Sequence, residues 1–208
     1  MRKADANARV KAWIKRGYAS IGMSVRYQSE MGNNEQSPEV LILDVDGVMT
    51  TGQFFYDERG KAMKVFGPDD NDALSILKPH ISIQFVSGDK RGFSISKKRI
   101  VDDMGFELDQ VSTIRRLDWI KQRYELDKVI YMGDGIFDHY VMRRVKYGIA
   151  TADADQNAKK YASYVTRRSG GNRAVSEACI HILEKFFTPF NPAEIPANLI
   201  KVSGEWTA

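Results

Sequence analysis

Short apolar runs, each bounded by polar or glycine residues, recur along the middle of the chain. Runs of this length between turn signals are typical of buried strands. They predict three main strands, at residues 41–43, 81–86 and 128–132. Shorter strands are expected at 108–111, 147–150 and 164–166, with helical segments between the strands. Strands that alternate with helices predict an α/β fold, a three-layer parallel sheet with helices on both faces.

Two further strand-like runs follow the first strand and are joined by a short turn that contains glycine. The runs cover residues 53–56 and 61–66, and the turn covers 57–60. The pattern predicts a β-hairpin at 52–66. This hairpin is apolar on more than one face, and an isolated hairpin is only marginally stable. We therefore expect it to pack against another subunit.

The two ends of the chain differ from the middle. Residues 1–37 form a basic N-terminal extension, with a short amphipathic helix pattern around Trp13 and then a polar linker. A helix docked on the protein surface and a membrane-surface or targeting segment both fit this pattern. Residues 38–185 are expected to form the catalytic domain. The aromatic tail 186–208 is expected to pack on it or on a neighbouring subunit.

Length, charge and cysteine content narrow the class of protein. The chain has 208 residues, enough for one domain with a real core, and a formal net charge of +4. This mild charge, without a long basic stripe, argues against nucleic acid as a partner. Cys179 is the only cysteine, which fits a reducing compartment, and we expect the cytoplasm. No apolar run approaches the length of a membrane span.

Three polar clusters follow predicted strands directly: Asp44 with Asp46, then Ser87, then Asp134. In a parallel sheet, ligands bind beyond the carboxyl ends of the strands, so the clusters are expected to meet at one edge. Asp44 and Asp46 are two residues apart and can point the same way. Buried like charges need a cation, and hard oxygen ligands suit Mg²⁺. Carboxylates, a hydroxyl and a metal together indicate phosphoryl transfer.

The clusters, in this order, resemble the motifs of the haloacid dehalogenase (HAD) superfamily. The matching segments are Asp44-Val45-Asp46-Gly47-Val48, Val86-Ser87-Gly88 and Gly133-Asp134-Gly135-Ile136-Phe137-Asp138. The resemblance is closer to one capless branch, the phosphatases of 3-deoxy-D-manno-octulosonate 8-phosphate and of related nonulosonate 9-phosphates. It covers about residues 39–184, and segments 46–50, 164–167 and 170–175 carry it.

The resemblance implies a role for each motif residue. Asp44 would be the nucleophile and a Mg²⁺ ligand. Asp46 would be the general acid and then the base that activates water, and its backbone carbonyl would bind the metal. Ser87 and Gly88 would hold the transferring phosphoryl group. The remaining two acids would act at the metal, Asp134 as the third protein ligand and Asp138 as its support.

The resemblance also implies a Rossmann-like fold without a cap domain. The stretch between Asp46 and Ser87 is used up by the hairpin and one helix, which leaves no room for a cap. Phosphatases of this branch close the site with a neighbour's hairpin and C-terminal segment, usually as a tetramer. We therefore expect a homotetramer built through residues 53–66.

The sequence departs from the family pattern at the lysine that offsets charge between nucleophile and phosphate. The alignment places Thr113 at this position. Arg116, three residues further on the same helix face, is the favoured substitute, and it would bind phosphate. Arg115 and Lys90 are the alternatives, and the site can also lack a substitute.

A second departure concerns the substrate. The branch usually has arginines at the positions of Asp69 and Asp89. Acids near the mouth of the site disfavour a substrate with its own carboxylate, because like charges a few ångströms apart repel. Lys90, Arg91 and Arg173 can compensate, and a neutral or amino-bearing phosphorylated small molecule is the main competing substrate class. Lys90, Asp70 and Arg173 are the candidate substrate contacts.

Two functions from different classes remain open. The first is a Mg²⁺-dependent phosphomonoesterase that hydrolyses a small phosphorylated metabolite, a sugar or sugar-acid phosphate of carbohydrate metabolism, through an aspartyl-phosphate. The second is a HAD-like oligomerisation or binding module that keeps the fold and has lost turnover. The intact Asp44, Asp46, Ser87 and Asp134 favour the enzyme, whereas the missing lysine favours the module.

Overall fold

The computed structural model describes residues 37–194 of the chain. The predicted amphipathic helix around Trp13 and the part of the tail beyond residue 194 lie outside the described residues. In the described part of the tail, Phe186, Phe187 and Phe190 pack against the hydrophobic core. No helix among the described residues is long and apolar enough to cross a membrane.

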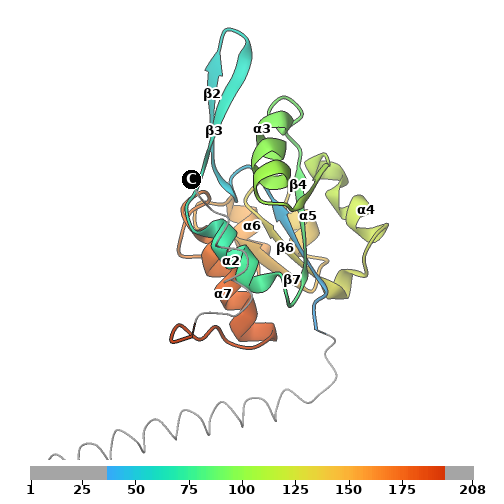
Figure 1. The fold of residues 1–208 in the computed structure, drawn as a ribbon. Coiled ribbons are helices and arrows are strands. Elements are labelled where there is room, and N and C mark those ends of the chain that lie inside the picture. Colours follow the sequence, from blue (N-terminus) through green and yellow to red (C-terminus); the bar gives the residue numbers. More distant parts are fainter. Residues whose placement is uncertain (1–36, 195–208) are drawn as a thin grey trace, which may run out of the picture. The chain divides into compact units, whose positions relative to one another are not determined.

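The centre of the fold is a six-stranded sheet in the order β5-β4-β1-β6-β7-β8 (Figure 1), in which all neighbouring strands are parallel. The strands are β1 Val40–Asp44, β4 Ser82–Ser87, β5 Glu107–Gln110, β6 Val129–Gly133, β7 Tyr147–Ala150 and β8 Tyr164–Val165. The central strands β1 and β6 are buried along their whole length, as expected for a parallel sheet covered on both faces. The predicted α/β fold is confirmed.

Helices cover both faces of the sheet, and alternate residues of β1 point to the two sides. Leu41 and Leu43 belong to one core, while Val40 and Ile42 belong to the other. On the first face lie α2 Asp70–Leu77, the π-helical segment Lys98–Asp103 that continues α3 Phe93–Lys97, and α7 Ala174–Phe186. On the second face lie α4 Arg116–Lys121, α5 His139–Met142 and α6 Gln156–Tyr161. Short 3-10 turns at Thr113–Arg115 and Leu126–Lys128 precede α4 and β6.

The predicted hairpin is present and projects from the body of the domain (Figure 1). It consists of β2 Thr50–Asp57 and β3 Gly60–Phe66, so it begins at residue 50 rather than at 52, because Thr50 pairs with Phe66. The chain between β1 and β4 is described throughout and holds this hairpin and α2, with no further domain. The expectation of a capless fold agrees with this connection.

Three adjacent strands end at the predicted polar clusters. β1 ends at Asp44, its neighbour β4 ends at Ser87, and its other neighbour β6 ends at Gly133, just before Asp134. The parallel register pairs Asp44 with Val86 and Leu43 with Met132. The three clusters therefore meet at one edge of the sheet, as the pattern predicts.

Candidate active site

Asp44 is held by the buried side chain of Arg116, the first residue of α4. The Arg116 guanidinium donates from Nη2 to Oδ1 of Asp44 at 2.8 Å and from Nη1 to Oδ2 at 2.6 Å. A two-point contact of this kind fixes both groups and is stronger than a neutral hydrogen bond. Burial raises the pKa of Asp44 to about 6, against the lowering effect of Arg116. The predicted nucleophile, Asp44, is therefore in direct contact with Arg116, the favoured substitute for the lysine.

Asp138 anchors the same arginine and the loop after β6. Its Oδ1 accepts hydrogen bonds from Arg116 Nη1 at 2.9 Å and from the Tyr131 hydroxyl at 2.6 Å. Its Oδ2 accepts from the backbone amides of Asp134 at 3.0 Å and Gly135 at 2.8 Å. Burial opposes the charged form of Arg116, but Asp44, Tyr131 and Asp138 hold the pKa of Arg116 well above its ordinary value. The arginine is therefore charged, and Asp138 anchors both it and the loop; the supporting role of Asp138 at a metal, which the resemblance implies, stays a prediction.

Asp134 completes an acidic group that fits a cation. Carboxylate oxygens of Asp44, Asp134 and Asp138 lie within 4.8 Å of one another. Burial, together with the charges of Asp44 and Asp138, raises the pKa of Asp134 to about 8. The buried Oδ1 of Asp134 has no hydrogen-bond partner among the described residues. A hard divalent cation would satisfy this oxygen and favour the ionised acids.

Gly47 makes room for Asp134. Its φ is +85°, and a Cβ at this position would lie 2.0 Å from Oδ2 of Asp134. Only glycine fits such a position without moving the acid. Both oxygens of Asp138 are engaged by the groups above and both oxygens of Asp44 by Arg116, so Oδ1 of Asp134, which has no hydrogen-bond partner among the described residues, is the most available side-chain ligand. The ligand role of the Asp46 carbonyl stays a prediction.

Asp46 and Ser87 contact each other directly. Ser87 Oγ donates to Asp46 Oδ2 at 3.1 Å and accepts from the Asp89 amide at 3.1 Å. The hydroxyl thus lies between the predicted general acid and the loop after β4. The structure brings Asp44, Asp46, Ser87 and Asp134 to one place, so the predicted constellation is geometrically consistent.

Two lysines of the hairpin enter the site, which the sequence did not indicate. Lys64 Nζ lies 2.7 Å from Asp46 Oδ1 and 2.8 Å from Asp89 Oδ2, and it donates to Ser96 Oγ at 2.8 Å. The contact with Asp46 is an ion pair without the directional geometry of a hydrogen bond. Lys61 Nζ donates to Asp89 Oδ2 at 2.6 Å.

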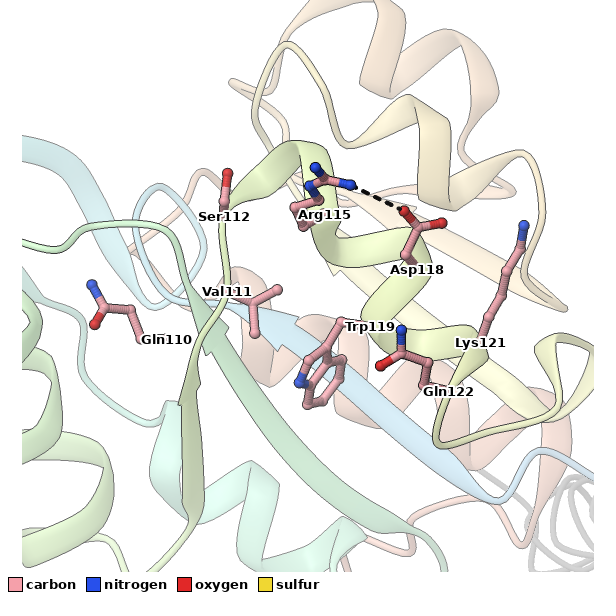
Figure 2. Close-up of a pocket in the computed structure, with 8 residues that line it drawn as sticks. All are labelled: Gln110, Val111, Ser112, Arg115, Asp118, Trp119, Lys121 and Gln122. Carbon is pink, nitrogen blue, oxygen red and sulfur yellow. Dashed lines mark ion pairs between the residues drawn. The ribbon is translucent and has the colours of Figure 1, made fainter.

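The alternative cation Arg115 lies away from this constellation. Figure 2 shows it lining a pocket beside α4, where it forms an ion pair with Asp118. The pocket has a volume of about 590 Å³, and the charged groups of the pair lie 3.9 Å apart. Its side chain is 77% exposed, whereas Arg116 is 2% exposed. Thr113 lies beside Gly88, where a Cβ on the glycine would be 3.2 Å from Thr113 Oγ1. Of these residues, Arg116 alone forms hydrogen bonds and an ion pair with Asp44.

The three predicted substrate contacts lie in different surroundings. Lys90 is exposed, after Asp89 on the loop that follows β4. Asp70 is buried, and its Oδ1 accepts from the Ser176 amide, which ties α2 to α7. Arg173 forms an ion pair with Asp69, and both residues have positive φ. Their contact with a substrate stays a prediction.

Sequence reasoning missed Lys61, Lys64 and Tyr131. A tyrosine inside a buried strand needs a partner for its hydroxyl, and this signal pointed to Tyr131. Lys64 shares a face of β3 with the half-buried Phe66, whereas Met63 and Val65 on the other face are exposed. This alternation of burial is visible only in the folded structure, because in the sequence Met63 and Val65 are the apolar neighbours of Lys64.

Fold and site together define a hydrolase of the HAD type, and comparison with known proteins gives the family. The sequence profile of the haloacid dehalogenase-like hydrolases matches residues 41–178, so the chain belongs to this family. It is 29% identical over 143 residues to the 3-deoxy-D-manno-octulosonate 8-phosphate phosphatase of Escherichia coli (strain K12), which covers 67% of this chain and 76% of that protein. The Yersinia pestis enzyme of the same name is 29% identical over 154 residues, covering 69% and 79%.

Solved structures agree with this assignment. The phosphatase of that name from Moraxella catarrhalis, in complex with magnesium, phosphate and KDO, superposes with a TM-score of 0.61 at 25% identity, covering 71% of this chain and 86% of that chain. The cobalt-bound enzyme from Haemophilus influenzae gives a TM-score of 0.62 at 28% identity, covering 71% and 88%. The predicted resemblance to this branch, and the prediction that the chain is an enzyme, are confirmed.

Proposed function

We propose that the protein is a Mg²⁺-dependent phosphomonoesterase that hydrolyses a small phosphorylated metabolite of the sugar or sugar-acid class. The observation that carries the proposal is the convergence of Asp44, Asp46, Ser87 and Asp134 at the ends of β1, β4 and β6. The similarity to octulosonate 8-phosphate phosphatases supports the reaction class.

In the first step, an Asp44 carboxylate oxygen attacks phosphorus, and the bond from phosphorus to the leaving oxygen breaks. Asp46 in its acid form gives a proton to this oxygen, so the product leaves as an alcohol. Ser87 Oγ donates to a phosphoryl oxygen. Asp44 and Asp134 would hold a divalent cation, which would supply neutralisation of the phosphoryl charge.

In the second step, Asp46 takes a proton from a water molecule, and the water oxygen attacks the phosphorus of the aspartyl-phosphate. The bond between phosphorus and Asp44 breaks, which releases inorganic phosphate and restores both acids. Arg116 fits the role of the missing lysine, because its charge lies at the carboxylate that carries the phosphoryl group. It stabilises negative charge at Asp44 in both steps.

One observation favours the second candidate, a HAD-like binding or oligomerisation module with weakened turnover. Arg116 engages both oxygens of Asp44, and the attack requires that one of them is released.

In either case we propose a homotetramer assembled through the hairpin. Its exposed apolar side chains, which suit such an interface, are Phe54, Phe55, Tyr56, Met63 and Val65.

The deciding experiment is release of phosphate from p-nitrophenyl phosphate by the full-length protein, with Mg²⁺ and after its removal by chelation. We expect metal-dependent release that falls by about 10³-fold or more in Asp44→Asn, the scale seen when a catalytic nucleophile is removed. Full activity in that variant would falsify the assigned nucleophile. Absence of turnover in the folded, metal-loaded wild type would favour the module.

A further inference from the structure

The two oxygens of the Asp44 carboxylate are held to different degrees. Oδ1 accepts a hydrogen bond from the Val45 amide at 2.7 Å and a second from Arg116 Nη2 at 2.8 Å. Among the described residues, Oδ2 accepts one hydrogen bond, from Arg116 Nη1 at 2.6 Å. An attack on phosphorus uses a lone pair of one oxygen, so the oxygen with fewer donors to give up attacks more easily. This difference favours Oδ2 as the attacking atom.

The hydrogen bonds of Arg116 favour the same oxygen. Nη1 carries two N–H groups but has three acceptors, which are Asp44 Oδ2, the Tyr131 hydroxyl at 2.7 Å and Asp138 Oδ1 at 2.9 Å. Nη2 has one acceptor in the described part of the chain, Asp44 Oδ1. If Oδ1 left the arginine, Nη2 would lose its acceptor. If Oδ2 leaves, Nη1 keeps one acceptor for each of its N–H groups.

The loss of an acceptor is costly here because the arginine is buried. The Arg116 side chain is 2% exposed, and its Nε has no hydrogen-bond partner in residues 37–194. A buried N–H group without an acceptor has lost its contact with water and gained no bond in return. The guanidinium therefore depends on Tyr131 and Asp138 to accept from Nη1 when Asp44 Oδ2 moves to phosphorus.

Tyr131 is fixed in a position that suits this task. It is fully buried in β6, next to β1 in the sheet. Its hydroxyl gives its only hydrogen to Asp138 Oδ1 at 2.6 Å, so the lone pairs of the phenol oxygen are left for Arg116. Asp138 supplies one acceptor to Nη1, its Oδ1, because its Oδ2 accepts from the amides of Asp134 and Gly135. The Tyr131 hydroxyl is thus the second acceptor that Nη1 needs.

We propose that Tyr131 is a positioning residue of the reaction: as the additional acceptor at Arg116 Nη1, it allows Asp44 Oδ2 to leave the arginine and attack phosphorus. In this step Oδ2 forms a bond to phosphorus, the bond from phosphorus to the leaving oxygen breaks, and Asp46 gives that oxygen a proton. Tyr131 neither gains nor loses a proton. The inference rests on the proposed function and deepens it, because it explains how a nucleophile that is bound at both oxygens can react.

The test is Tyr131→Phe, which removes the hydroxyl and keeps the ring in the core. Nη1 then has two acceptors, and the departure of Oδ2 leaves one of its N–H groups unpaired. With the full-length, metal-loaded protein and p-nitrophenyl phosphate, we expect kcat to fall about tenfold or more, the scale of one unpaired buried donor. KM should change by less than about twofold, because the cost arises in the transition state and not in substrate binding. The first turnover, followed by stopped flow, should slow by the same factor as kcat.

Two comparisons separate this role from a purely structural one. Tyr147→Phe is the matched control, because Tyr147 is buried at the start of the neighbouring strand β7 and its hydroxyl pairs with His181 Nε2 at 2.9 Å. This variant should leave kcat unchanged. In an Arg116→Ala background, Tyr131→Phe should lower kcat by less than about twofold, because no guanidinium is left to lose an acceptor. All rates are taken per folded molecule, at a temperature below the unfolding midpoint of each variant.

An unchanged kcat in Tyr131→Phe would overturn the inference, and so would a rise in KM without a fall in kcat. An equal fall in kcat in the wild-type and Arg116→Ala backgrounds would also overturn it, because Tyr131 would then act independently of the arginine. If the Arg116→Ala background is too slow to measure, the split between kcat and KM decides. In each of these cases the wild type still releases phosphate and the proposed function stands. If the wild type releases no phosphate from the aryl ester, the proposed function fails and this inference fails with it.

Discussion

Arg116 binds both carboxylate oxygens of Asp44, through contacts of 2.8 and 2.6 Å, although the two residues are far apart in the sequence. The arginine comes from the start of α4 and the aspartate from the end of β1. Asp138 and the Tyr131 hydroxyl accept further hydrogen bonds from the same guanidinium. A charge fixed in this way costs no reorganisation when negative charge develops nearby.

Replacement of Arg116 by alanine is predicted to lower turnover at least tenfold, because a charge contact to the transition state is lost. It also leaves Asp44 and Asp138 buried without their cation, which costs about 3–5 kcal/mol of unfolding free energy. Turnover per folded molecule and thermal unfolding should be measured on the same samples. The matched control is Arg115→Ala, whose exposed ion pair with Asp118 contributes at most about 1 kcal/mol. An unchanged rate in Arg116→Ala would move the role to another cation, such as Lys90.

Gly47→Ala is predicted to weaken the metal site. The added methyl group would overlap Oδ2 of Asp134, and the positive φ adds backbone strain of about 1–3 kcal/mol. We expect at least about tenfold more metal to be needed for half-maximal activity, as is typical when the support of a ligand is disturbed. Gly60→Ala at the hairpin turn is the control, since its φ is also positive but nothing lies within 4 Å of the added group. If both variants need the same metal concentration as the wild type, Gly47 is not required for the position of Asp134.

Asp70 is predicted to make the fold less stable as the pH rises. Burial raises its pKa from 3.8 to about 6, so the folded state favours the protonated form. Its stabilising contribution is present below pH 3.8 and is lost as the pH rises through 6, by about 3 kcal/mol in total. Urea unfolding of the wild type and Asp70→Asn between pH 4 and 7.5 measures this. The free energy of the variant relative to the wild type should rise with pH, and a constant difference would contradict the prediction.

The hairpin is predicted to assemble the proposed tetramer. Phe55 and Met63 pair across β2 and β3, and both are exposed. Replacing both by serine removes apolar surface without disturbing the core, so we expect the tetramer to dissociate in sedimentation velocity at micromolar concentration. Arg59→Ala at the hairpin tip should leave the assembly intact. A wild type that sediments as a monomer at this concentration would rule out the proposed assembly.

The sequence by itself determined the sheet and the positions of Asp44, Ser87 and Asp134. Apolar runs of strand length place these residues at strand ends, and a parallel sheet brings the carboxyl ends of its strands to one edge. The hairpin was equally clear, because its turn and its alternation are local features. For such elements the pattern within a short window is sufficient.

Only the tertiary structure decided which cations serve the site. Neighbouring residues of a helical turn point in different directions, so the choice between Arg115 and Arg116 depends on how the start of α4 packs on the sheet. Lys64 reads as an ordinary polar position of a hairpin, yet its partners Asp46, Asp89 and Ser96 come from other elements. Contacts between distant segments follow from packing of the whole chain, and for this reason no local pattern revealed the cluster around Asp89.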